Sequence, residues 1–420
     1  MTIRTGDRQL IKEMNIALVI NTIRECQPIS RVEIAEKTGL GRSTVTGIIN
    51  VLLREGLVSE SGSAESAAGR RPVLLTFNAA ARYAVGVKLA PKSATVALVD
   101  LTARVLDTEE IPVAPHRGPE VVIRAIKEAL ETVLARRHAA YDKLLGVGVV
   151  MPGAVNPDTG VALSSYFLGW ANMPVRDLLQ QELNLPVYVD NDANAMALAE
   201  TLYGAGRGAE DVLAMTVGVG IGAGVIIGGQ IHRGAYFSAG ELGHVCVQPD
   251  GPPCVCGRRG CLEAVAADAA VVRRAREELQ AGRAEFLRRL VGGHIDLLTR
   301  EDVVAAALEG DEAARSILAE SGRWLGLAAA NAANLFSPER IVVGGEAVIE
   351  AGELILGPMR EAMAGIVFPT YPEGRFVVQA ALGRNAWLQG AAALVLADAF
   401  EVPLHQHNTL AMARRVGQTP

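Results

Sequence analysis

The chain has 420 residues, half of them hydrophobic, with 40 Lys and Arg against 46 Asp and Glu, which gives a net charge of −6. This length can bury a large core in two or three domains, and the acidic balance excludes a uniformly basic nucleic-acid binder. It leaves room for a small DNA-binding module, because the first 80 residues have ten basic and eight acidic side chains. No signal-peptide core is visible, and the apolar stretch 386–400 contains Gln389 and Asp398, so we expect a cytoplasmic protein without a membrane span.

Three helices are predicted near the N-terminus. Apolar residues recur at helical spacing from Asn15, and a second helix opens at Ser30, where Glu33 is placed to complete a capping box. That helix ends at Gly39, and the helical pattern returns over residues 45–56. Two helices joined by a short glycine-containing turn, with a third before them, are typical of a helix-turn-helix unit.

Two strands, at 57–60 and 73–77, follow these helices and enclose a flexible loop, so residues 1–80 are predicted to form a winged helix-turn-helix domain. The start of the third helix and the loop carry short polar or basic side chains that suit base edges and phosphates. The alternative is a winged helix used for protein contact or as a spacer. The candidate DNA-contacting residues are Arg42, Ser43, Thr44, Thr46, Arg70 and Arg71.

Strands alternate with helices in the remainder of the chain, which predicts an α/β body. Residues 83–90 and 94–101 are predicted to form a hairpin, followed by a helix at 121–137 and strands at 144–155 and 186–193. No internal repeat period is visible in the sequence.

Polar residues follow the last of these strands. Asn191, Asp192 and Asn194 lie where the strands of α/β sheets usually present ligand-binding groups, and Asp192 is placed to accept a hydrogen bond from a hydroxyl or to remove its proton. Helix capping is an equally good explanation for Asp and Asn at this junction. A glycine-rich stretch farther on allows a close approach of backbone to phosphate, which by itself is a weak signal. Its glycines are Gly218, Gly220, Gly222 and Gly224.

A metal site is predicted between residues 244 and 261. His244, Cys254, Cys256 and Cys261 offer one imidazole and three thiolates within eighteen residues, the ligand chemistry of one structural zinc ion per chain. Cys246 is a rival ligand that spacing alone does not exclude. Because this cluster accounts for most of the five cysteines, no disulfide framework is required, which favours a reducing compartment.

Two carboxylates flank the metal site, Glu241 on one side and Glu263 on the other. Neither is needed for four-coordination, so both are free to face a ligand. Our hypothesis is that the metal shapes one wall of a pocket for a polyhydroxylated ligand. The alternative is a zinc knuckle that only fastens a surface loop.

The motifs ELGHVCVQPDGPPCVCGRRGCLE, VDNDANAMALAE, TVGVGIGAGVIIGGQIHRG and IVVGGEAV resemble those of the ROK family of repressors, open reading frames and sugar kinases. The resemblance covers nearly the whole chain, including the N-terminal domain and its GRRP wing. It implies an actin-like ATPase (ribonuclease H-like) α/β body of two lobes. The implied domains are 1–80 for the winged helix, 81–200 for the first lobe, completed by a helix at 384–400, and 201–383 for the second lobe with the zinc loop.

The resemblance also implies a sugar in the cleft between the lobes, bound by Asn191, Asp192, Glu241, His244 and Glu263, with His244 also a zinc ligand. The chain departs from the kinases of the family where these bind nucleotide phosphates. Kinases have an acidic residue, paired glycines and a hydroxyl in the first hairpin, and a second hydroxyl in the glycine-rich stretch. This chain has Lys88, Ala90, Pro91, Lys92 and Val219 at those positions. Proline lacks an N–H donor and alanine adds a Cβ, so the phosphate-binding turn is expected to be lost.

These observations predict a sugar-responsive DNA-binding transcriptional regulator, most simply a repressor, that is not an enzyme. Its partners would be operator DNA and a sugar or sugar derivative. A symmetric operator implies a homodimer or homotetramer. Two alternatives stay open: an active ATP-dependent sugar kinase with a DNA-binding extension, and a regulator controlled by a protein partner without sugar.

Overall fold

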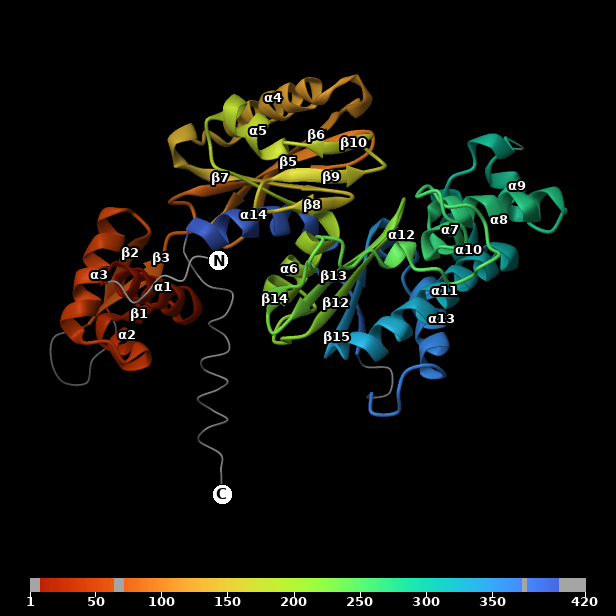
Figure 1. Cartoon of the computed structure of the whole chain (residues 1–420). Helices are drawn as coiled ribbons and strands as arrows, with labels where there is room; N and C mark the ends of the chain where they lie inside the picture. Colours follow the sequence, from red (N-terminus) through yellow and green to blue (C-terminus); the bar gives the residue numbers. More distant parts are fainter. Residues whose placement is uncertain (1–7, 64–71, 293, 372–375, 400–420) are drawn as a thin grey trace.

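The computed structural model describes residues 8–63, 72–292, 294–371 and 376–399, which form a small N-terminal unit and a body of two lobes (Figure 1). We call the N-terminal unit, up to Phe77, the reader domain. None of the helices within the described ranges has the length and apolar character that crossing a bilayer requires.

The reader domain has three helices and a three-stranded sheet of order β1-β3-β2. Ser30 Oγ accepts a hydrogen bond from Glu33 N, and Glu33 Oε2 accepts one from Ser30 N at 2.9 Å, so the predicted capping box is confirmed. Gly39 ends the second helix with φ of 70°. The first helix begins seven residues before the predicted Asn15, and strand β1 was not predicted. The elements are α1 (Arg8–Cys26), β1 (Ile29–Ser30), α2 (Arg31–Thr38), α3 (Arg42–Arg54), β2 (Val58–Ser63) and β3 (Val73–Phe77).

The first lobe is built on a five-stranded sheet of order β11-β7-β4-β5-β6. The predicted hairpin is its β4-β5 pair, and β7 and β11 are parallel to β4. The strands are β4 (Tyr83–Leu89), β5 (Ser93–Asp100), β6 (Val105–Pro112), β7 (Leu144–Met151) and β11 (Val187–Asn191). The remaining elements are α4 (Pro119–Arg137), α5 (Val175–Leu183) and a small sheet of β8 (Ala154–Asn156), β9 (Val161–Ser165) and β10 (Trp170–Met173).

The second lobe has its own five-stranded sheet, of order β14-β13-β12-β15-β16, and most of its helices cover one side of that sheet. The strands are β12 (Val212–Val217), β13 (Ile221–Ile227), β14 (Gln230–Ile231), β15 (Arg340–Gly344) and β16 (Val377–Gln379). The helices are α7 (Leu262–Ala266), α8 (Asp268–Gln280), α9 (Glu285–Leu290), α10 (Arg300–Leu308), α11 (Glu312–Phe336), α12 (Glu346–Ala351) and α13 (Glu353–Ala364). Helix α6 (Asp192–Tyr203) begins directly after β11 of the first lobe and packs against the sheet of the second.

The two sheets have the same topology. In each, the first three strands in chain order form an antiparallel meander, the fourth strand adds in parallel beside the first, and the fifth adds in parallel beside the fourth. The duplication has no counterpart in the sequence, where no repeat is visible. Two lobes of this kind facing each other are the actin-like architecture, so the predicted fold class is confirmed.

Two helices lie between the sheets. Helix α14 (Ala386–Ala399) packs on β4 and β7, whereas α6 packs on β12 and β13, and the two helices contact each other (Figure 1). The approach of α14 is so close that a Cβ at Gly86 or Gly148 would collide with its backbone. Glycine at these two positions therefore lets the last helix of the described chain lie directly against the sheet of the first lobe.

The core of the reader domain is continuous with the first lobe. Ile20, Ile49 and Leu75 belong to the same buried apolar cluster as Val99 of β5 and Val395 of α14. The reader domain is therefore packed on the body through apolar side chains and is not a tethered appendage.

Candidate functional site

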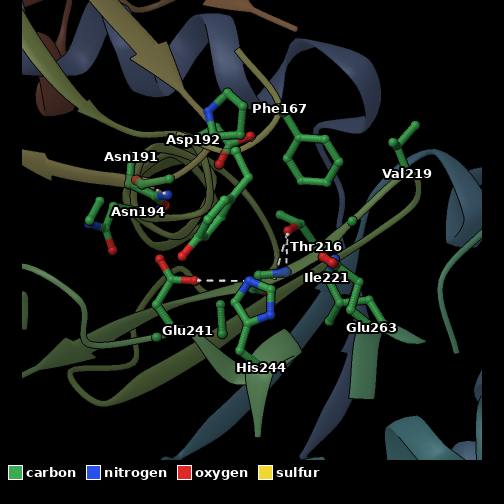
Figure 2. Close-up of a pocket in the computed structure, with 18 of the residues that line it drawn as sticks. Phe167, Asn191, Asp192, Asn194, Thr216, Val219, Ile221, Glu241, His244 and Glu263 are labelled. Carbon is green, nitrogen blue, oxygen red and sulfur yellow. Dashed lines mark hydrogen bonds and ion pairs between the residues drawn. The ribbon is translucent and has the colours of Figure 1, made fainter. Parts of the chain in front are cut away.

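A cavity of about 470 Å³ opens between the lobes, a size typical of small-molecule sites. Figure 2 shows Asn191, Asp192 and Phe167 on one side of it and Glu241, His244 and Glu263 on the other. All five residues that the family resemblance assigned to sugar, separated by as many as 72 positions in the chain, thus line one cavity.

Asn191 is the N-cap of α6. Its Oδ1 accepts hydrogen bonds from Ala193 N at 2.8 Å and Asn194 N at 3.1 Å, and its Nδ2 donates to Gly153 O at 3.0 Å. The capping alternative is therefore confirmed for this residue, although the side chain also lines the cavity. Its amide fixes the start of α6 and so positions the next residue.

Asp192 follows as the first residue of α6 and points into the cavity (Figure 2). Burial raises the pKa of its carboxyl, and the nearby Lys88 partly opposes this rise. A desolvated carboxylate is a strong acceptor for a ligand hydroxyl, because no bulk water competes for it.

Glu241 and His244 form the opposite wall. Glu241 Oε2 lies 3.9 Å from His244 Nε2, and burial raises the pKa of the glutamate despite the opposing effect of the imidazole. The other ring nitrogen, Nδ1, lies 3.6 Å from Cys254 Sγ. His244 therefore presents one nitrogen to the cavity side and the other to the cysteines.

Glu263 joins the cysteine cluster to the glycine-rich loop. Its buried carboxylate accepts a hydrogen bond from Ile221 N at 3.1 Å, and its other oxygen lies 3.8 Å from Cys254 Sγ. The residue lies in the short helix α7, which begins directly after Cys261. The loop with the predicted metal ligands thus leads directly into the helix that places this carboxylate in the cavity wall.

The four predicted metal ligands lie together, with their ligand atoms all within 4.8 Å of one another. Cys256 Sγ and Cys261 Sγ are 3.7 Å apart. Tetrahedral zinc with Zn–S bonds of about 2.3 Å requires sulfur atoms about 3.8 Å apart, so these side chains fit a metal ion with little movement. The rival Cys246 has an exposed side chain and is not in this group. Burial raises the pKa of the Cys254 thiol to about 12, so a metal would have to displace a proton there.

The glycine-rich loop between β12 and β13 has two different roles. Gly218 and Gly220 line the cavity beside the exposed Val219. Gly224 does not line it, because this residue lies in β13 against Ala193 and Ala197 of α6. Gly222 also lines the cavity, so three of the four glycines of the predicted phosphate-approaching stretch face it and only the last does not.

The turn between β4 and β5 also reaches the cavity, where Lys88, Ala90 and Pro91 are among the lining residues. The backbone N–H of Ala90 donates to Ser93 O at 2.8 Å and closes the turn, and Pro91 has no N–H. This turn accordingly offers no free backbone donor from either residue to a phosphate.

Sequence reasoning missed several cavity residues. Phe167, Phe237 and Trp387 add aromatic surface, and Glu346 adds a further carboxylate at the cavity wall. Glu346 follows the glycine pair of the IVVGGEAV motif, which was the available signal. The aromatic residues carry no local pattern that would have distinguished them from core residues.

Helix α3 presents an open polar face on the reader domain. Arg42, Ser43, Thr44 and Thr46 are all exposed, whereas Val45 and other apolar residues of the helix are buried. Asn50, one turn after Thr46, is exposed on the same helix and was missed by sequence reasoning. The predicted wing residues Arg70 and Arg71 lie outside the described residues.

Comparisons with known proteins agree with this architecture. Residues 18–59 match the winged helix-turn-helix DNA-binding family, and residues 84–398, three quarters of the chain, match the ROK family. The chain belongs to the ROK family.

Among its ROK relatives, a xylose repressor of Caldicellulosiruptor bescii is 31% identical over 95% of this chain and 99% of its own. A solved ROK family transcriptional regulator, a homolog of the E. coli MLC protein, superposes with a TM-score of 0.79 at 28% identity, covering 93% of this chain and 96% of its own. The ROK glucokinase of Streptomyces griseus, solved with glucose and AMPPNP, is 34% identical with a TM-score of 0.68 and covers 74% of this chain and 98% of its own. The glucokinase matches the body, whereas the two regulators also match the N-terminal part.

Proposed function

We propose that this ROK protein is a sugar-responsive transcriptional repressor, which binds operator DNA through its reader domain and a sugar or sugar derivative in its cleft. The observation that carries the proposal is the combination, in one chain, of an exposed polar α3 and a cavity walled by carboxylates from both lobes. The similarity to a xylose repressor along nearly the full length supports the same class of function. Such a regulator acts in the cytoplasm, where the DNA is.

Sugar hydroxyls need acceptors and donors in a fixed arrangement. We assign Asp192 and Glu241 as the principal acceptors, from opposite walls, with Glu263 and His244 completing the ring of polar groups. Asn191 contributes mainly by positioning Asp192. The aromatic ring of Phe167 supplies apolar surface on which the C–H groups of a sugar ring can pack.

A single structural zinc ion is proposed for the group of His244, Cys254, Cys256 and Cys261. The ligand separations support it, because they match tetrahedral geometry. When bound, the ion supplies rigidity and no reaction chemistry. It fixes His244 and, through the start of α7, Glu263 in the cavity wall.

We further propose that the cleft binds its sugar without phosphorylating it. Lys88, Ala90 and Pro91 provide neither the acidic group nor the backbone donors that a nucleotide with its metal ion needs. The sequence similarity to a glucokinase favours the competing function, an active kinase. A coupled assay of ATP-dependent phosphorylation on a panel of sugars separates the two, and turnover above background would establish the kinase.

DNA binding is assigned to α3, with Arg42, Ser43, Thr44, Thr46 and Asn50 facing the major groove. Arg70 and Arg71 of the wing are proposed to contact phosphates or the minor groove. A palindromic operator would be read by two reader domains, so we propose a homodimer or a homotetramer.

The deciding experiment combines two measurements on the full chain. A thermal-shift screen of sugars identifies ligands that raise the melting temperature, because a ligand selective for the folded state stabilises it. Operator affinity is then titrated with each positive sugar at fixed salt, and we expect a change of about 5- to 150-fold, the usual range for coupling between two sites. Operator binding that no sugar alters would contradict sugar control and favour a protein partner.

A further inference from the structure

One ion pair crosses the cleft between the lobes. Lys88 Nζ, from β4 of the first lobe, lies 2.9 Å from Oε1 of Glu346, the first residue of α12 in the second lobe. The lysine ammonium also lies 3.5 Å from the ring centroid of Trp387, at the start of α14. Burial would raise the pKa of Glu346, but the pairing with Lys88 outweighs it and holds that pKa below its usual value. Glu346 is therefore a carboxylate near neutral pH.

The pair lines the same cavity as Asp192 and the glycine-rich loop. The second carboxylate oxygen of Glu346 lies against Gly218, 2.9 Å from the position that a Cβ would occupy there. Lys88 and Glu346 both act electrostatically on Asp192. The space between Asp192 and the glycine-rich loop thus contains a protein ammonium and a protein carboxylate.

We propose that the pair of Lys88 and Glu346 is an interlobe latch that holds the cleft closed in place of a nucleotide, and that α14 transmits its state to the reader domain. The inference rests on the proposed sugar-responsive function and adds how the cleft is connected to DNA binding. A bound nucleotide would connect the lobes through its phosphates, whereas here each lobe supplies one charge of a pair that attracts them directly.

Helix α14 contacts both the pair of Lys88 and Glu346 and the reader domain. Its first turn contacts the latch through Trp387, and Leu388 and Val395 belong to the apolar cluster that forms the core of the reader domain. Gln389 Nε2 donates to Ala103 O at 2.8 Å and fixes the helix to the turn after β5. A change in lobe separation that moves Lys88 relative to Trp387 therefore acts on the helix against which the reader domain packs.

The test measures the distance between the lobes in the sugar-free protein. Nitroxide labels are attached through a genetically encoded ketone amino acid at two exposed positions, Glu128 on α4 and Ser316 on α11, so that the native cysteines stay unlabelled. Lys88→Met keeps an apolar side chain against Trp387 and removes the charge, and Glu346→Gln removes the opposite charge. Pulsed electron–electron double resonance should show a population with a longer distance between the labels in each variant. The ratio of closed to open molecules should fall roughly fivefold, as expected for a partly exposed ion pair.

The double variant K88M/E346Q distinguishes a pair from two separate effects. If the residues act on each other, the Glu346→Gln change has no further effect once Lys88 is already Met. Glu182→Gln is the matched control, because Glu182 pairs with Lys127 at 2.7 Å within the first lobe and should leave the interlobe distance unchanged. Distances in both single variants equal to those of the wild type would overturn the latch.

Operator affinity provides the second measurement. A sugar that contacts both walls also favours closure, so both single variants should shift operator affinity in the direction opposite to the effect of saturating sugar. Lobes that open with no change in operator affinity would overturn the role of α14. If no sugar binds the wild type, the proposed function fails, while the distance measurement, which uses no sugar, still decides the latch.

Discussion

At the scale of single residues, the proposed metal group and the wall of the cavity share side chains. His244 belongs to both groups, with one ring nitrogen beside Cys254 and the other beside Glu241. Glu263 connects the same cysteine to the backbone of the glycine-rich loop. Removal of a bound ion should therefore shift side chains of the cavity wall as well as the loop that holds the ion.

The cysteines allow a direct test of this dependence. We expect Cys256→Ser and Cys261→Ser to lose about one equivalent of zinc per chain and to weaken sugar binding roughly 10- to 100-fold, as disturbed metal surroundings commonly do. Cys246→Ser is the control, because this exposed thiol lies outside the group and its replacement should retain the metal. Mass spectrometry of metal content and calorimetry of sugar binding give the two results, and full zinc content in the first two variants would refute the assignment.

The buried carboxyls at the cavity predict a pH dependence. Burial raises the pKa of both Asp192 and Glu241 above the usual values in the sugar-free protein. If the sugar binds the ionised forms, protons compete with it as the pH falls, and affinity should decrease from neutral pH toward pH values near the raised pKa. Calorimetry across this range should show that fall, and Asp192→Asn should make it shallower. Zinc content and melting temperature at each pH serve as controls, and an affinity that rises on acidification would contradict the assignment.

At the scale of elements, α3 separates its two faces cleanly. Val45 and the other apolar residues at helical spacing are buried, whereas Thr46, Gly47 and Asn50 between them are exposed. The sequence predicted this helix because its apolar periodicity, and the capping box and glycine end of the helix before it, are all local signals. Asn50 was not predicted, because the expected contacts were limited to the N-terminal turn of the helix, whereas Asn50 lies one turn farther along the exposed face.

Alanine substitutions on this helix provide the corresponding test. Arg42→Ala and Asn50→Ala should each weaken operator binding by about 1–3 kcal/mol, the contribution of a base-reading side chain. Lys12→Ala removes one exposed positive charge from α1 and is the control for nonspecific charge loss. Fluorescence anisotropy at one salt concentration measures all three. Equal losses in the three variants would mean that α3 does not read bases.

Other elements could not be placed from the sequence. The sequence predicted α14 from its apolar pattern. Only the structure shows where this helix packs, so closely that a Cβ at Gly86 or Gly148 would collide with its backbone. Lys88 and Glu346 are 258 positions apart, so their pairing depends on how the two lobes meet. The departure of Lys88 from the kinase pattern was visible in the sequence, whereas its partner was not.

At the scale of the whole molecule, the resemblance of the motifs predicted the fold class. The repeated topology of the two sheets shows how the two-lobed architecture is built. Each lobe places a parallel strand end at the cleft, where α6 begins in one and α12 in the other. The duplication escaped sequence analysis because strand order and direction can be kept while the side chains change. The sequence could therefore indicate which residues converge, but the spacing of the lobes and the shape of the cavity come from packing between distant segments.

The apolar cluster shared by the reader domain and the first lobe has a consequence for protein engineering. Ile49, Val99 and Val395 belong to one buried group, although they come from three distant segments. A hybrid regulator that exchanges only the first 80 residues would join two unmatched halves of a single interior. A hybrid that keeps allosteric control must therefore preserve the contacts between the exchanged domain and the body. Either the buried residues of β5 and α14 that contact the reader domain are exchanged together with it, or they are redesigned to fit the new domain.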